Sequence, residues 1–212
     1  MPDASPDDTA IEDGRRLFAR HCQFLTTAVG RGSFPEEALP EVAFAGRSNA
    51  GKSSLINALT GQRGLARAST QPGRTQAINF FEYPDDLRLV DLPGYGFAKA
   101  PKATAEAWGR LVHGFLRNRA AMRRVVLLID ARRGLMASDR KMLADLEDMA
   151  VVYQIVLTKA DKLPAAKVPP LVDAVAKEIA QHAAAFPLVL ATSARRKTGI
   201  AELRASLAEL AA

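Results

Sequence analysis

The amino-acid sequence predicts an α/β fold in three layers, with a mostly parallel central sheet of about six strands and helices on both faces. Two observations predict this class. From residue 41 onward, short apolar runs alternate with longer amphipathic stretches, as strands and helices do in a parallel sheet. In addition, the run 125–130 (VVLLID) is apolar almost throughout, which is typical of a strand buried on both faces. That strand should therefore lie at the centre of the sheet.

Composition sets limits on the kind of protein. Of the 212 residues, 48% are hydrophobic and 25% are charged, as in an ordinary globular domain. The first residues are acidic and polar, so we expect a mobile extension at residues 1–22 and a folded domain at residues 23–212. No apolar run reaches the ~18 residues of a membrane span, and the single Cys22 cannot form an internal disulfide. We expect a cytoplasmic monomer with no membrane partner.

The first expected strand and helix enclose a phosphate-binding motif. Between an apolar strand at 41–45 and a helix at 52–59, the segment GRSNAGKS fits the pattern G-x-x-x-x-G-K-[ST]. Its glycines let backbone N–H groups face a polyphosphate, toward which the helix directs its positive end. We expect nucleotide contacts at Gly46, Arg47, Ser48, Asn49, Ala50, Gly51, Lys52 and Ser53. Lys52 should act in catalysis by reaching the β- and γ-phosphates, and the Ser53 hydroxyl should bind Mg²⁺.

A long loop is expected before the second strand. Residues 61–76 are rich in Gly, Arg, Ser, Thr and Gln and show no periodicity, whereas residues 77–83 form an apolar strand. Thr75 closes the loop, and its hydroxyl is expected to complete the Mg²⁺ shell while the γ-phosphate is present. This would make Thr75 a catalytic residue, with Thr70 as the alternative.

The third strand, residues 87–91, ends at an acidic residue in the sequence DLPG. Ligands of open α/β sheets bind at the carboxyl ends of the strands, so Asp91 should lie beside the phosphate-binding loop and hold Mg²⁺ through water. Gly94 should offer its backbone N–H to the γ-phosphate and release it after cleavage, which places Gly94 among the expected catalytic residues.

The remaining elements continue the alternation. We expect helices at about 103–118, at 138–149, at about 165–184 and at 200–210, alternating with strands at 125–130, 154–158 and 188–191. Ser138 is a favourable N-cap for the second of these helices, and Gly199 lies just ahead of the last.

Two short motifs after the last strands indicate guanine. In the segment TKAD, the carboxylate of Asp161 can accept hydrogen bonds from guanine N1–H and N2–H₂, a donor pair that adenine lacks. The Lys159 stem would flank the base, and the later segment TSA would present N–H groups to guanine O6. We expect base contacts at Thr158, Lys159, Ala160, Asp161, Thr192, Ser193 and Ala194. In this order the motifs predict a P-loop GTPase with a Ras-like G domain that binds GTP and GDP.

The motifs GRSNAGKSSLINAL, PGRTQAINFF, DLPGYGFA, TKAD and TSA closely resemble the EngB family of bacterial ribosome-biogenesis GTPases, in the TrmE/Era-like branch. The resemblance spans about residues 41–212. It implies assistance in late assembly of the large ribosomal subunit and a role in cell division and septation. It also implies nucleotide contacts at Gly73, Arg74, Thr75, Gln76, Ala77, Asp91, Leu92, Pro93 and Gly94, with Mg²⁺ on Ser53 and Thr75.

The sequence also bears on the hydrolysis step. Many GTPases orient the attacking water with a Gln after DxxG, but Tyr95 stands there, so we expect slow intrinsic turnover. Tyr95 and Phe97 would instead pack as a hydrophobic flap. Asn49 resembles the residue that helps to hold K⁺ beside the phosphates in Era-like relatives, which leads to the hypothesis of K⁺ stimulation. Alternatively, Asn49 bonds the loop to itself.

Basic residues suggest the partner. The chain has 29 Lys and Arg against 23 Asp and Glu. Arginine clusters occur at 117–124, at 132–133 and at 195–197, alongside Arg63, Arg67 and Arg74 in the loop. No aromatic platform accompanies them, which favours docking on structured ribosomal RNA of the large-subunit precursor by shape and charge. The alternative is a solvated surface on which these residues balance helix dipoles.

Two other function classes stay open. A metabolic phosphotransferase would pass the γ-phosphoryl group to a small substrate under a closing lid, but Asp161 and the lack of an obvious lid in the sequence argue against it. A cell-division scaffold would sense guanine nucleotide without hydrolysing it, which Tyr95 in place of Gln would allow.

Overall fold

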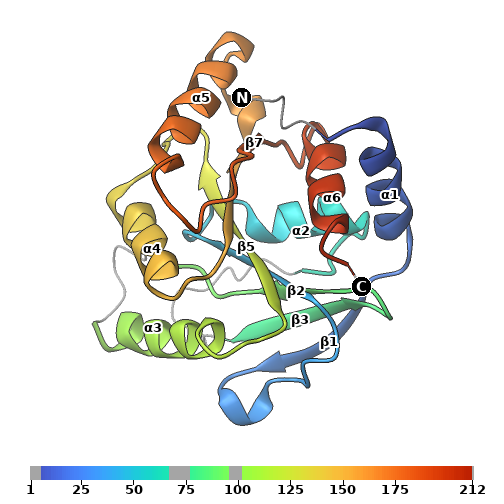
Figure 1. Ribbon diagram of the computed structural model, residues 1–212, viewed down its shortest axis with the longest axis vertical. Coiled ribbons are helices and arrows are strands. Elements are labelled where there is room, and N and C mark those ends of the chain that lie inside the picture. Colours follow the sequence, from blue (N-terminus) through green and yellow to red (C-terminus); the bar gives the residue numbers. More distant parts are fainter. Residues whose placement is uncertain (1–5, 67–76, 96–101, 212) are drawn as a thin grey trace.

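The computed structural model describes residues 6–66, 77–95 and 102–211. In these residues a sheet of seven strands runs in the order β1-β3-β4-β2-β5-β6-β7, with helices on both faces (Figure 1). The strands are β1 Gln23–Ala28, β2 Glu41–Gly46, β3 Ile78–Tyr83, β4 Leu87–Asp91, β5 Met122–Asp130, β6 Tyr153–Thr158 and β7 Leu190–Ala191. The helices are α1 Asp8–Ala19, α2 Lys52–Thr60, α3 Lys102–Leu116, α4 Ala137–Asp148, α5 Val168–Ile179 and α6 Ile200–Ala208.

The predicted three-layer, mostly parallel fold is confirmed. Strands β4, β2, β5, β6 and β7 are parallel neighbours, while β3 pairs antiparallel with β4 and β1 antiparallel with β3. Side chains alternate along β2 and sort into two cores: Ala43 and Ala45 face α3, α4 and α5, whereas Val42 and Phe44 face α1, α2 and α6. As predicted, β5 is central, since it lies between β2 and β6.

The expectation of a mobile segment at residues 1–22 is wrong for its described part. Asp7 caps α1 by accepting a hydrogen bond from the Ala10 N–H at 2.8 Å, and Phe18 near the end of this helix is buried against Tyr83. The acidic residues of this segment led us to expect a tail, although the segment contains a helix with one apolar face.

A glycine brings α1 close to α6. A Cβ built on Gly14 would lie 2.5 Å from the Ala205 backbone nitrogen, so only glycine permits this approach. Strand β1, which we did not expect, follows α1 and brings the sheet to seven strands.

Candidate functional site

The phosphate-binding loop connects the end of β2 to the start of α2, at the carboxyl edge of the parallel strands. A Cβ on Gly46 would lie 3.0 Å from the Leu128 carbonyl oxygen, so the chain passes β5 too closely for a larger residue. Gly51 has φ +99°, a left-handed conformation that glycine adopts without strain, and α2 begins at the next residue. Asn49 is also left-handed, with φ +65°. These conformations turn the loop around the N-terminus of α2, where N–H groups suit an anion.

Lys52 and Asp91 meet at this edge. The Lys52 Nζ forms an ion pair with Asp91 Oδ1, although the two residues belong to different elements. Asp91 is buried at the end of β4, and its Oδ2 lies 3.5 Å from the Asn79 amide nitrogen of β3. In the first turn of α2, Ser53 directly follows Lys52. A hydroxyl and a carboxylate at neighbouring strand and helix ends are hard oxygen ligands of the kind that Mg²⁺ takes.

The DLPG segment lies against the phosphate-binding loop. The Ser48 N–H donates to the Tyr95 carbonyl at 3.0 Å, and the Tyr95 N–H donates to the Gly46 carbonyl at 3.2 Å. A Cβ on Gly94 would lie 3.2 Å from Ser48 Oγ. Gly94 thus lies against Ser48 of the phosphate-binding loop.

Tyr95 points inward. Its ring is buried in the core below the sheet edge, and its hydroxyl donates to Asp139 Oδ1 of α4 at 2.9 Å. Burial, reinforced by the Asp139 carboxylate, raises the pKa of Tyr95 far above its usual range, so the hydroxyl stays protonated as a donor. The expected hydrophobic flap is therefore wrong for Tyr95, while Phe97 lies outside the described residues.

The residues expected to read guanine lie at the ends of β6 and β7. Asp161 Oδ1 accepts a hydrogen bond from Ser193 Oγ at 2.7 Å, and this bond lowers the pKa of Asp161 below its usual value. Beside them is a cavity of about 320 Å³. Its walls include Gly51, Thr158, Lys159, Asp161, Thr192 and Ala194. Both TKAD and TSA thus open onto one space next to the N-terminus of α2.

The TKAD segment is also bonded to the phosphate-binding loop. Thr158 Oγ1 donates to the Ala50 carbonyl, and Lys159 Nζ donates to the Asn49 carbonyl. Ala160, whose N–H donates to the Thr192 carbonyl at 3.0 Å, links TKAD to TSA. These bonds join three segments from distant parts of the sequence.

Part of the expected site lies outside the described residues. Ala77 is the first residue of the described segment 77–95 and lies just before β3, but Thr70 and the residues Gly73, Arg74, Thr75 and Gln76 lie outside the described residues. Leu92 is buried in the core, and its N–H donates to the Phe44 carbonyl at 3.1 Å. Pro93 follows it in the turn toward Gly94.

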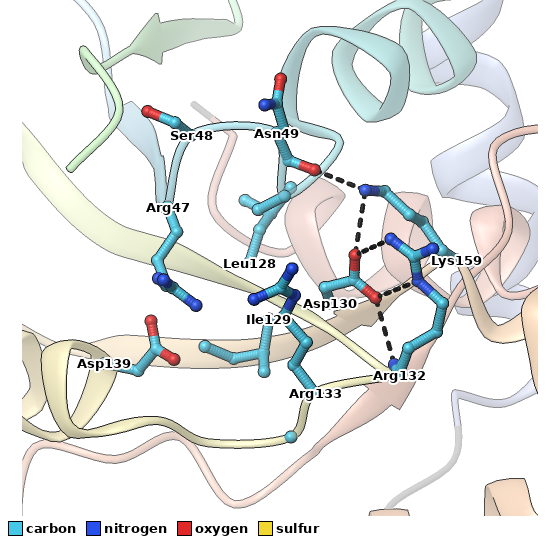
Figure 2. Close-up of a pocket in the computed structure, with 12 residues that line it drawn as sticks. Arg47, Ser48, Asn49, Leu128, Ile129, Asp130, Arg132, Arg133, Asp139 and Lys159 are labelled. Carbon is cyan, nitrogen blue, oxygen red and sulfur yellow. Dashed lines mark hydrogen bonds and ion pairs between the residues drawn. The ribbon is translucent and has the colours of Figure 1, made fainter. Parts of the chain in front are cut away.

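Sequence reasoning missed Asp130, the last residue of β5. Its Oδ2 accepts from Lys159 Nζ at 3.0 Å and from Arg132 at 2.7 Å (Figure 2). Burial opposes ionisation of Asp130, but the Arg132 and Lys159 hydrogen bonds outweigh it and hold the pKa of this carboxyl well below its usual range. Asp130 therefore fixes the Lys159 side chain. The rule that singled out Asp91, a carboxylate ending an apolar strand, would have found it.

Comparison with known proteins identifies the family. The family model described as "50S ribosome-binding GTPase" matches residues 41–159. A probable GTP-binding protein EngB of Bradyrhizobium diazoefficiens is 53% identical over 96% of this chain and 95% of its own length. The chain belongs to the EngB family of GTP-binding proteins. EngB of Rhodospirillum rubrum, at 51% identity over 95% of this chain and 90% of its own, is similarly related.

Solved structures place the EngB fold among other GTPases. A crystal structure of a probable GTP-binding protein EngB aligns with a TM-score of 0.64 at 26% identity, covering 80% of this chain and 97% of that one. Era in complex with MgGDPNP and nucleotides 1506–1542 of 16S ribosomal RNA aligns with a TM-score of 0.62 at 22% identity, covering 82% of this chain and 57% of that one. The chain is thus a P-loop GTPase. Among its described residues, no helix has the length and apolarity needed to cross a membrane.

The arginine clusters of this EngB-family chain divide into buried and exposed residues. Arg119 bonds to buried Glu41, and Arg124 is buried against Ser206, Gln154 and the Phe186 ring, so counting these two among the RNA-facing residues was wrong. Both guanidiniums donate hydrogen bonds to residues within the fold. The arginine and lysine residues of the clusters that remain exposed are Arg117, Arg123, Arg132, Arg133, Arg195, Arg196 and Lys197.

Proposed function

We propose that this protein is a slow, Mg²⁺-dependent GTPase switch that assists assembly of the large ribosomal subunit and is needed for normal cell division and septation. The observation that carries the switch is the convergence of Lys52, Asp91, Gly94 and Asp161 at one edge of the sheet. The ribosomal role is supported by the family description, "50S ribosome-binding GTPase". We further propose that the protein works as a cytoplasmic monomer.

The phosphate site would work through charge and position. Lys52, which is paired with Asp91 in this structure, would turn to the β- and γ-phosphates. The Gly94 N–H would donate a hydrogen bond to the γ-phosphate. Ser53 and Thr75 would hold Mg²⁺ through their hydroxyls, with Asp91 bonded through water. The metal would neutralise charge on the phosphate oxygens. Gly73, Arg74, Gln76 and Ala77 would complete the nucleotide contacts.

Slow hydrolysis follows from the position of Tyr95. Its hydroxyl is engaged by Asp139, so it cannot hold an attacking water beside the γ-phosphate. Asn49 is exposed, and within the described residues its side chain makes no hydrogen bond, which weakens the alternative in which it bonds the loop to itself. Its amide oxygen is thus free to hold K⁺ near the phosphates.

Hydrolysis in K⁺ and in Na⁺ tests the switch and the cation together. At equal ionic strength we expect multiple-turnover phosphate release to be at least about tenfold faster in K⁺, because the cation offsets charge that develops in the transition state. Asn49→Ala should remove the difference but keep GDP binding. Equal rates in both salts would exclude the K⁺ role, and no release in either would favour the non-hydrolysing scaffold.

Binding to the large subunit tests the partner. If about five exposed arginine and lysine side chains contact RNA phosphates, affinity should fall on the order of 10²-fold to 10³-fold between about 50 and 200 mM salt. Co-sedimentation with large-subunit precursors should also be stronger with a GTP analogue than with GDP. Binding that ignores both salt and nucleotide would contradict the proposal.

A further inference from the structure

A second cavity, of about 170 Å³, lies beside the nucleotide site, and no ligand has been assigned to it above (Figure 2). It is bounded by the phosphate-binding loop, the end of β5 and the segment that leads into α4. Of the residues lining it, only Lys159 also lines the cavity of about 320 Å³ beside Asp161. Because Lys159 is bonded to both Asn49 and Asp130, its side chain forms a wall between the two spaces.

The carboxylates around this cavity are already satisfied. Asp130 is matched by Arg132 and Lys159. Asp139 accepts the Tyr95 hydroxyl on Oδ1 and the Met136 N–H on Oδ2, each at 2.9 Å. Asp130 is therefore shared between two cations, and Asp139 forms no ion pair with an arginine of the cavity among the described residues.

Two further arginines add positive charge to the cavity walls. Arg47 and Arg133 form no ion pair within the described residues, and Figure 2 shows both guanidiniums ending in the space between the loop and β5. Among the described residues, Arg47 Nη1 donates to the Met136 sulfur at 2.7 Å, and Arg47 Nε is buried with no hydrogen-bond partner. A thioether is a weak acceptor, and a buried donor left unpaired is costly, so an anion between these side chains would be stabilised.

We propose that this cavity is a second anion site, in which Arg47 and Arg133 bind a phosphate group of the RNA backbone. Guanidinium forks match phosphate oxygens in pairs, and the volume accommodates one phosphate. Free inorganic phosphate shares this chemistry and is the other possible source. The RNA assignment rests on the proposed function, whereas the anion site itself does not.

The position of the site ties RNA docking to the nucleotide switch. Arg47 belongs to the phosphate-binding loop, and its neighbour Ser48 is bonded to Tyr95, which in turn is held by Asp139 at the cavity wall. A phosphate bound to Arg47 is therefore connected, through Ser48 and Tyr95, to the DLPG segment that contains Gly94. Docking and nucleotide state are then coupled in both directions, as linkage requires.

The test uses Arg133→Gln in the full-length, GDP-loaded protein, with Arg123→Gln as the matched control. Arg123 is an exposed arginine at the other end of β5, with one long contact of 3.4 Å to the Ala120 carbonyl. Inorganic phosphate is titrated while the arginine Nε–Hε NMR signals are followed, and affinity for large-subunit ribosomal RNA is measured in parallel. We expect Arg133→Gln to weaken both by about tenfold or more, with GDP affinity unchanged. Arg123→Gln should leave phosphate binding as in the wild type.

The outcomes separate the two sources of phosphate. Loss of phosphate binding with RNA affinity unchanged would overturn the RNA assignment and leave a site for free phosphate. Phosphate that shifts no signal of Arg47 or Arg133, together with unchanged RNA affinity in Arg133→Gln, would overturn the anion site. If the wild type bound no RNA at all, the ribosomal function would fail, while the phosphate titration would still decide the site.

Discussion

Asp161→Asn is expected to lower the affinity for GDP by about 10³-fold, since it removes a charged acceptor of two guanine donors and places an amide N–H₂ against them. Ser193 orients this carboxylate in the present structure, through the 2.7 Å hydrogen bond to Oδ1. Because that bond lowers the pKa of Asp161, the group stays charged as the pH falls toward the ordinary range of an aspartate, and GDP affinity should not fall in mild acid. Titration with a fluorescent GDP analogue measures both effects.

The base specificity of the variant provides a further readout. Xanthine carries an oxygen where guanine carries the 2-amino group, so the amide introduced at this position could donate to that oxygen, and Asp161→Asn should bind xanthosine diphosphate more tightly than GDP. Asp173→Asn, at an exposed position of α5, is the matched control and should bind GDP as the wild type does. Unchanged GDP affinity in Asp161→Asn would mean that guanine is read elsewhere.

Glu41→Gln is expected to reduce the free energy of unfolding by about 3–5 kcal/mol, because it breaks a buried charge network. Glu41 is fully buried at the start of β2, and its Oε1 accepts from Arg88 at 3.0 Å and from Arg119 at 2.6 Å. Removing the carboxylate charge leaves two buried guanidiniums facing a neutral amide. The Arg119 guanidinium also lies 5.4 Å from the Phe115 ring centre, so the disturbance should spread toward α3.

Urea denaturation measures this loss. The control is Glu202→Gln, an exposed residue in the first turn of α6, which should change stability by less than about 0.5 kcal/mol. A loss below about 1 kcal/mol for Glu41→Gln would show that other carboxylates, Glu82 for Arg88 and Glu37 for Arg119, compensate the lost charge.

The sequence predicts those parts of the fold and site that depend on local signals. The phosphate-binding loop is a contiguous motif with fixed glycine positions, and Asp91 and Asp161 follow apolar runs, so their places at the sheet edge follow from topology. Strand β1 and helix α1 were not predicted, because Phe18 is buried only through its contact with Tyr83, which lies far along the chain. The charged residues that flank Phe18 in the sequence gave no hint of that contact.

Arg119, Arg124 and Tyr95 show the same limit at single residues. In the sequence, both arginines stand among other cations and read as surface charge. Their burial depends on partners that come from other strands and helices, Glu41 for Arg119 and Ser206 for Arg124. Tyr95 likewise turns inward because Asp139 of α4 accepts its hydroxyl. Such pairings carry no periodic signal, and only the folded chain reveals them.

The packing of α1 on α6 affects how the chain can fold during translation. Nearly the whole described sequence separates Gly14 from Ala205, yet the two backbones touch. As the polypeptide leaves the ribosome, α1 emerges early and its apolar face stays uncovered until α6 has followed. The helix layer that supports the phosphate-binding loop is therefore completed last. A polypeptide stalled before α6 would have an incomplete nucleotide site and an exposed apolar helix face prone to aggregation.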